Sequence, residues 1–167
     1  MQSLPTHLGG LRGKVTLPTS KSLTNRALIA SAVAGGGTIV APLDCADTRV
    51  LAAALEAAGW PIEWGQEIRI GERTVPKSVV SLDLADSGTG SRLVLALLAA
   101  SPGKSVVDGT ARLRERPMAP LVESLIRLGA DVVSRDGFLP VEIDGRKMRG
   151  GPVEMKHVVY FLLISSQ

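Results

Sequence analysis

The chain has 167 residues, of which 45% are apolar and 21% are charged, a composition typical of a globular domain with its own core. The net charge of +3 comes from 19 Lys and Arg against 16 Asp and Glu spread along the chain, so no nucleic-acid-binding surface is predicted. The sequence shows no secretory signal and no apolar run of about 18 residues, which argues against a membrane span and favours a cytoplasmic protein.

An extended segment over residues 13–18 leads into the first predicted helix, which ends at a run of glycines. Thr19 or Ser20 is expected to cap this helix, and Lys21 and Arg26 lie in its first turns. A helix N-terminus favours an anion because it carries unpaired N–H donors and the positive end of the helix dipole. Two interpretations stay open here: a phosphate- or carboxylate-binding site, or a capped helix whose cations are solvated.

The other predicted elements alternate between strands and helices, with Asp47 expected to cap the second helix. Hairpin turns are expected at Gly65-Gln66 and at Asp136-Gly137. The expected strands cover residues 38–41, 60–64, 67–70, 79–84, 105–107, 130–134 and 139–143. The expected further helices cover residues 48–58, 93–100 and 117–128.

The two halves of the chain follow one supersecondary plan. Gly37 and Gly103 are 66 residues apart, and Gly59 and Gly129 are 70 residues apart. In each unit these glycines follow the ends of the two predicted helices. The predicted fold class is therefore α/β (α+β), built from repeated β-α-β-α-β-β units, with a third unit beginning near Pro152.

Two polar loops stand at the starts of predicted helices. The glycines of residues 86–92 allow a ligand to approach the backbone closely, although an ordinary helix start fits them equally well. Farther on, Arg112, Arg114 and Arg116 are expected to share one side of an extended loop. Their guanidinium groups suit carboxylate and phosphate oxygens, and a solvated basic loop is the alternative.

Metal and nucleophile chemistry finds little support in the sequence. His7 and His157 are isolated from each other, and no His, Cys and carboxylate set has metal-ligand spacing. No base accompanies the single cysteine, Cys45, which is interpreted as a small buried side chain in a reducing compartment. We therefore predict no metal site and no hydrolytic triad.

Several segments, in the expected order over roughly residues 10–155, resemble the 5-enolpyruvylshikimate-3-phosphate synthases. They are LPTSKSLTNRAL (17–28), DTR (47–49), DSGTGSR (86–92), DGTARLRERP (108–117) and LVESLIRLGA (121–130). The resemblance implies a fold of two globes, each made of three β-α-β-α-β-β units. In that fold this chain would hold one incomplete globe.

The resemblance also implies an activity, that of a 3-phosphoshikimate 1-carboxyvinyltransferase. Such an enzyme moves the enolpyruvyl group of phosphoenolpyruvate to the 5-hydroxyl of shikimate 3-phosphate in the shikimate pathway of aromatic amino-acid biosynthesis. The family is the target of glyphosate and needs neither a metal nor an organic cofactor. The implied partners are the two anionic substrates, with no nucleic acid and no membrane.

Site residues are implied by the resemblance position by position. Lys21 would contact both substrates and stabilise charge during addition to phosphoenolpyruvate. The residues implied to bind shikimate 3-phosphate are Lys21, Ser22, Arg26, Ser165 and Ser166. The residues implied to bind phosphoenolpyruvate are Lys21, Gly88 through its backbone N–H, Arg112 and Gln167.

The expected domain organisation has an N-terminal strand segment, residues 1–18, that pairs with the second globe in the full-length family. Residues 19–167 would form the first globe, with units at about 19–78 and 79–145 and the start of a third. The apolar run 158–164 lies close to the end of the sequence, and we expect a truncated chain. Such a chain would lack the second half of the site and would be inactive without a complementary C-terminal fragment.

Two alternatives stay open. The first is the sister enzyme of the same fold that transfers enolpyruvyl to UDP-N-acetylglucosamine. The second is a non-catalytic module that uses the repeat to bind anions or RNA ends, whose affinity would fall steeply with salt.

Overall fold

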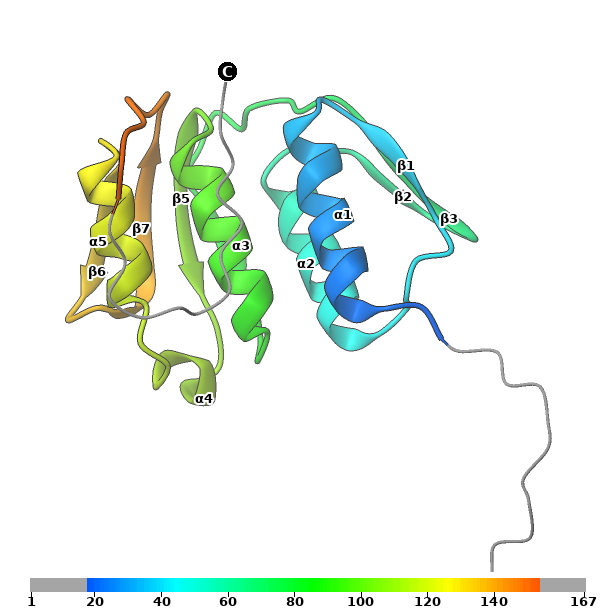
Figure 1. Ribbon diagram of the computed structural model, residues 1–167, viewed down its shortest axis with the longest axis horizontal. Coiled ribbons are helices and arrows are strands. Elements are labelled where there is room, and N and C mark those ends of the chain that lie inside the picture. The colour runs from blue at the N-terminus through cyan, green and yellow to red at the C-terminus, as the bar shows by residue number, and fades with distance from the viewer. Residues whose placement is uncertain (1–17, 154–167) are drawn as a thin grey trace, which may run out of the picture.

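The computed structural model describes residues 18–153, in which helices and strands are mixed along the chain as predicted (Figure 1). The helices are α1 (Lys21–Val33), α2 (Ala46–Ala57), α3 (Gly88–Ala99), α4 (Ala111–Arg114) and α5 (Ala119–Arg127). The strands are β1 (Gly37–Val40), β2 (Ile62–Trp64), β3 (Glu67–Ile70), β4 (Val80–Asp83), β5 (Gly103–Asp108), β6 (Asp131–Arg135) and β7 (Phe138–Gly145). The α/β fold class is therefore confirmed.

The first sheet has the strand order β1-β3-β2 and is antiparallel throughout. Ile70 in β3 pairs with Gly37 on one side and with Ile62 on the other. Ile68 and Ile70 are buried while Arg69 between them is exposed, as the alternation of a half-buried strand requires. The hairpin predicted between the second and third strands is present.

The second sheet has the strand order β4-β5-β7-β6, with β4 parallel to β5 and the other pairs antiparallel. Leu139, Val141 and Ile143 along β7 are all buried, so one face of this sheet belongs to the core. The β6–β7 hairpin turns at Asp136 and Gly137, whose φ angles of 53° and 79° are those of a tight hairpin turn.

The two sheets share one connectivity, which confirms the predicted repeat. The order β1-β3-β2 of the first unit matches β5-β7-β6 of the second, and in both units the helices precede the same strands. In the second unit β4 completes the sheet beside β5. Its predicted counterpart, residues 13–18, falls almost wholly outside the described residues.

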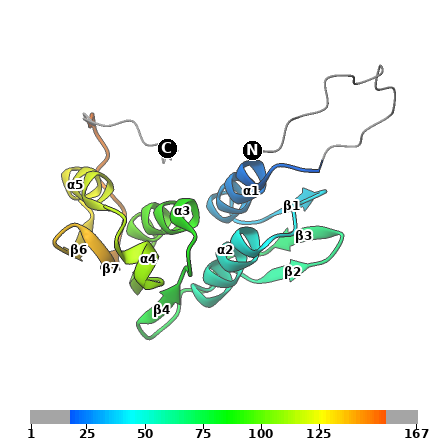
Figure 2. The same ribbon diagram turned by 90° about the horizontal axis from the view of Figure 1, so that it is seen from below.

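The helices lie side by side and the sheets lie on the outside of them (Figure 2). α1, α2 and α3 contact one another, and each contributes side chains with no exposed surface, among them Leu28, Leu51 and Leu95. These three helices run in one direction, so their N-termini meet at one end of the molecule, the lower end in Figure 1. The core thus sets the place where the helix dipoles converge.

The opposite ends of these helices are joined by Arg73. Its Nε donates to the carbonyl oxygen of Ala58 at 2.9 Å, and its Nη1 donates to that of Pro102 at 2.8 Å. The guanidinium also stacks on the Trp60 ring, 4.3 Å from the ring centre, and the Trp60 indole donates to Ala32. Arg73 therefore ties the carboxyl ends of α2 and α3, and with them the two units, together.

Helix starts differ from the sequence prediction in three places. Cys45, not Asp47, caps α2, because the Thr48 hydroxyl accepts from the Cys45 backbone N–H at 3.1 Å and begins the helix earlier. The glycines predicted as a loop form the first turn of α3, which begins at Gly88. Pro117 precedes α5 instead of opening it.

Replacement of Leu51 by alanine will test the core. Leu51 in α2 has no exposed surface, so Leu51→Ala should lower the unfolding free energy by about 2–5 kcal/mol. Leu23 in α1 is 65% exposed, and the matched Leu23→Ala change should cost less than about 0.5 kcal/mol. Urea unfolding followed by circular dichroism measures both values, and equal losses would contradict the described packing.

Candidate functional site

The N-termini of α1, α2 and α3 form the candidate site. Lys21, Ala46 and Gly88 are the first residues of these helices, which pack on one another in pairs. The short helix α4 lies at the same end of the molecule (Figure 1). Unpaired N–H donors and three aligned helix dipoles make this end attractive to anions.

Lys21 carries the positive charge that stands at the start of α1. The Ser20 hydroxyl accepts the backbone N–H of Leu23 and caps the helix, as predicted. The Lys21 ammonium lies 2.5 Å from Oδ2 of Asp47 in the first turn of α2, with about half of the Lys21 side chain exposed. The hydrogen bond and charge of Asp47 raise the pKa of Lys21, so this residue stays a cation.

Asp47 connects this cation to the start of α3. The hydrogen bond from Lys21 lowers the pKa of Asp47 most, and the Ser87 hydroxyl and the positive charge of Arg116 lower it further. Burial acts in the opposite direction and is outweighed. The carboxylate therefore lies among groups from α1, from α3 and from the segment after α4.

Gly88 opens α3 and leaves room for an arginine. Ser87 caps the helix by accepting the backbone N–H of Gly90 at 3.2 Å. A β-carbon on Gly88 would lie only 2.4 Å from Nη1 of Arg116. The absence of a side chain at Gly88 thus lets the Arg116 guanidinium approach the helix N-terminus.

Arg92 has a structural role that its repeat counterpart Arg26 does not share. Its Nη1 donates to the Gly88 carbonyl at 2.7 Å and its Nη2 to the Pro117 carbonyl at 2.8 Å. Burial, and then the charge of Arg116, lower the pKa of Arg92. Arg26 is exposed on α1.

The arginines after β5 do not share one side, so that prediction is wrong. The segment forms the helix α4, which turns successive side chains in different directions. Arg112 is exposed, Arg114 forms two hydrogen bonds of 2.8 and 2.5 Å with Asp108, and Arg116 points to Gly88. Of the three arginines, only Arg116 is among the charges that lower the pKa of Asp47.

The structure describes some of the predicted site residues and not others. Lys21, Ser22 and Gly88 lie in the first turns of α1 and α3 at the converging helix ends, while Arg26 lies farther along α1 and Arg112 lies in α4. The side chains of Lys21, Ser22, Arg26 and Arg112 are all exposed. Ser165, Ser166 and Gln167 lie outside the described residues. The resemblance implied no role for Asp47 or Arg116: Asp47 was expected only as a helix cap, and Arg116 only as one of three arginines suited to anions.

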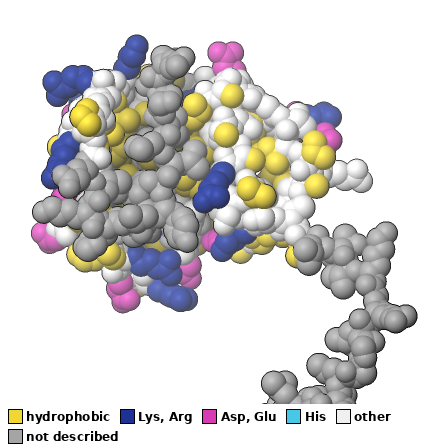
Figure 3. Space-filling model, in the orientation of Figure 1, with side chains coloured by type: hydrophobic (Ala, Val, Ile, Leu, Met, Phe, Trp, Pro, Cys, Tyr) yellow, Lys and Arg dark blue, Asp and Glu magenta, His cyan; other side chains and the backbone are white. Residues whose placement is uncertain are grey.

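Figure 3 shows apolar side chains at the surface over α1 and basic side chains near the lower end of this helix. Leu23 and Val33 are the large apolar side chains of α1 that are exposed. Within residues 18–153, no group of His, Cys, Asp and Glu side chains has the geometry to hold a metal ion. The same residues include no helix of the length and apolarity needed to cross a bilayer.

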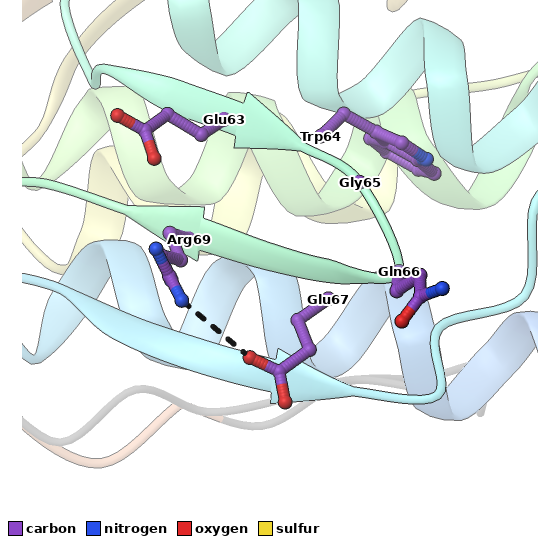
Figure 4. Close-up of a pocket in the computed structure, with 6 residues that line it drawn as sticks. All are labelled: Glu63, Trp64, Gly65, Gln66, Glu67 and Arg69. Atoms are coloured by element: carbon purple, nitrogen blue, oxygen red, sulfur yellow. Dashed lines mark ion pairs between the residues drawn. The ribbon is translucent and has the colours of Figure 1, made fainter.

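A separate hollow of about 390 Å³ lies over the β2–β3 hairpin (Figure 4). Glu67 and Arg69 form a long ion pair of 4.0 Å in it, and Trp64 on β2 is another of its lining residues. This hollow shares no residue with the converging helix ends, so it belongs to a different part of the surface.

A pair of glycine substitutions will test the arrangement around Arg116. Gly88→Ala should leave the protein stably folded but move the Arg116 guanidinium, because the clash involves the flexible end of that side chain. Gly90→Ala would crowd the Ser87 cap at 2.6 Å and should cost about 1 kcal/mol of stability. The Nε–H NMR signal of Arg116 and urea unfolding separate the two effects. An Arg116 signal that does not change in Gly88→Ala would contradict the described contact.

Comparison with known proteins places this geometry in a family. The family model described as EPSP synthase (3-phosphoshikimate 1-carboxyvinyltransferase) matches residues 5–167. A 3-phosphoshikimate 1-carboxyvinyltransferase of Opitutus terrae is 39% identical over 155 residues, covering 87% of this chain and 36% of the relative. One of Methanoculleus marisnigri is 40% identical over 156 residues, covering 89% of this chain and 37% of the relative.

A solved structure agrees with these sequences. The EPSP synthase from Acinetobacter baumannii matches with a TM-score of 0.69 and 29% identity, covering 92% of this chain and 36% of that one. The chain thus spans little more than a third of the length of the curated relatives it matches. Since the family model covers nearly every residue, the chain belongs to the EPSP synthase family.

Proposed function

We propose that this chain supplies the N-terminal part of an enzyme that moves the enolpyruvyl group of phosphoenolpyruvate to the 5-hydroxyl of shikimate 3-phosphate. The observation that carries the proposal is the placement of Lys21, in a family member, where three helix N-termini converge. Both substrates carry several negative charges, and cations together with helix N-termini are the groups that bind such ligands. Neither the UDP-sugar enzyme nor an RNA-end module is supported by the comparisons.

The two substrates are assigned to different units of the repeat. Ser22 and Arg26 on α1 bind shikimate 3-phosphate, and the Gly88 N–H and Arg112 bind phosphoenolpyruvate. Lys21 contacts both, which is supported by the Asp47 contact that links the start of α1 to the start of α3. Ser165, Ser166 and Gln167 complete the two sets.

The proposed reaction forms a bond between the 5-oxygen of shikimate 3-phosphate and the central carbon of the enolpyruvyl group. The bond from that carbon to the phosphate oxygen breaks, phosphate leaves with the electron pair, and the proton that the 5-hydroxyl gives up ends on the released phosphate. Negative charge grows on the phosphate, and the Lys21 ammonium and the helix N–H groups stabilise it. The chain's own residues supply this stabilisation without a cofactor.

Proton transfer and closure around the substrates are assigned to a second globe. Residues 1–18 pair with that globe, and residues 19–167 belong to the first globe. A complementary C-terminal fragment is then the partner that restores activity, and neither nucleic acid nor a membrane is required. The site of action is the cytoplasm, which the single cysteine supports.

Calorimetric titration with shikimate 3-phosphate tests the binding part of this proposal. The unchanged chain should bind it saturably, and Lys21→Ala should weaken the affinity at least about tenfold, since a charge-assisted contact is lost. Lys104→Ala is the matched control, because Lys104 is exposed on β5 and pairs with Asp144 at 3.3 Å away from the helix ends. The affinity of the Lys104→Ala variant for shikimate 3-phosphate should equal that of the unchanged chain.

Two outcomes would contradict the proposal. Equal binding by the unchanged chain and Lys21→Ala would remove Lys21 from the site. Affinity for RNA ends that falls steeply with salt, without affinity for shikimate 3-phosphate, would favour the non-catalytic module.

A further inference from the structure

Asp47 is a carboxylate in the middle of a site for anions. It is partly exposed, and its Oδ2 lies 2.5 Å from the Lys21 ammonium. A negative charge at this place repels an incoming phosphate. A carboxylate here must therefore favour anion binding in some other way. The contacts of Asp47 with its neighbours indicate what that role is.

The start of α2 holds Asp47 in place. Thr48 has no exposed surface, and its hydroxyl donates to the Leu43 carbonyl at 2.8 Å while accepting from the Cys45 N–H. Asp47 lies beside it in the first turn, where the helix dipole favours a negative charge. A short side chain on a fixed helix turn has little freedom, so the carboxylate is a rigid group.

Lys21, by contrast, carries a long side chain with about half of its surface exposed. An unpaired lysine of this kind samples many rotamers, and a ligand must order it at a cost in side-chain entropy. A carboxylate that already holds the ammonium removes part of this cost before the ligand arrives. The contact therefore pre-orders the cation.

The charges around the pair balance the carboxylate. The Asp47 carboxylate accepts a hydrogen bond from the Lys21 ammonium, and the Ser87 hydroxyl and the positive charge of Arg116 also lower its pKa. Cys45 is the other titratable group that acts on Lys21, and its effect is smaller than that of Asp47. The repulsion between Asp47 and an anion is thus offset by the charges of Lys21 and Arg116.

We infer that Asp47 is a positioning residue, which fixes the Lys21 ammonium between the N-termini of α1 and α3 so that a substrate anion meets an oriented donor. This inference rests on the proposed function for the identity of the anion. Asp47 acts through Lys21 and does not contact the ligand. Its contribution should therefore disappear when Lys21 is absent.

A double-mutant cycle tests this dependence. Asp47→Asn should weaken shikimate 3-phosphate binding by about five- to tenfold in calorimetry, while Asp47→Asn in the Lys21→Ala background should cause no further loss. Asp44→Asn is the matched control, because Asp44 is exposed in the same segment and its carboxylate binds Arg49 at 2.7 and 2.6 Å. This control should bind like the unchanged chain.

NMR titration of the Lys21 ammonium gives a second measurement that needs no ligand. Asp47→Asn should lower the pKa of Lys21 towards its ordinary value, and Asp44→Asn should not. If the unchanged chain does not bind shikimate 3-phosphate, the proposed function fails, and this titration still tests the contact.

Three results would overturn the inference. Tighter binding by Asp47→Asn would make Asp47 a competitor of the ligand. An equal loss in the presence and absence of Lys21 would make its role independent of the ammonium. An unchanged Lys21 pKa in Asp47→Asn would show that the two groups do not interact in solution.

Discussion

The parallel packing of α1, α2 and α3 is the constraint on which the rest of the structure depends. Leu28, Leu51 and Leu95 are buried in the core that these contacting helices share, and strands return the chain between successive helices, so the dipoles of the three helices point the same way. Such an arrangement needs negative charge nearby, and Asp47 supplies it in the described residues. The lysine that binds Asp47 is therefore part of the same electrostatic balance that makes this end attractive to an anion.

The repeat explains why the site draws on both units. Each unit presents a helix N-terminus with a capping serine, Ser20 in the first and Ser87 in the second. The units differ in how they use the arginine of the first helical turns. The first keeps an exposed Arg26, whereas the second turns Arg92 inward to hold the backbone of Gly88 and Pro117. The arginine of the first unit is thus exposed to solvent, and that of the second unit stabilises the backbone around it.

Periodicity and glycine breakers were sufficient to predict the strands, the hairpins and the repeat, because those features depend on local patterns of apolar and turn residues. The start of α2 was predicted wrongly because its capping hydrogen bond joins Thr48 and Cys45. Cysteine is not among the residues preferred at a helix N-cap. The resemblance drew attention to Lys21 and Gly88. The place of Asp47 beside Lys21 and that of Arg116 beside Gly88 were not predicted, since they depend on contacts between segments that are distant in the sequence.

Arg73 has a consequence for how the molecule unfolds. Repeat proteins whose units touch weakly lose them one at a time. Here the Arg73 guanidinium is held in the first unit by the Ala58 carbonyl and the Trp60 ring, and it donates across to the Pro102 carbonyl of the second unit. Together with the packing of α3 on α1 and α2, this bond couples the two repeats, and we expect them to unfold in a single transition.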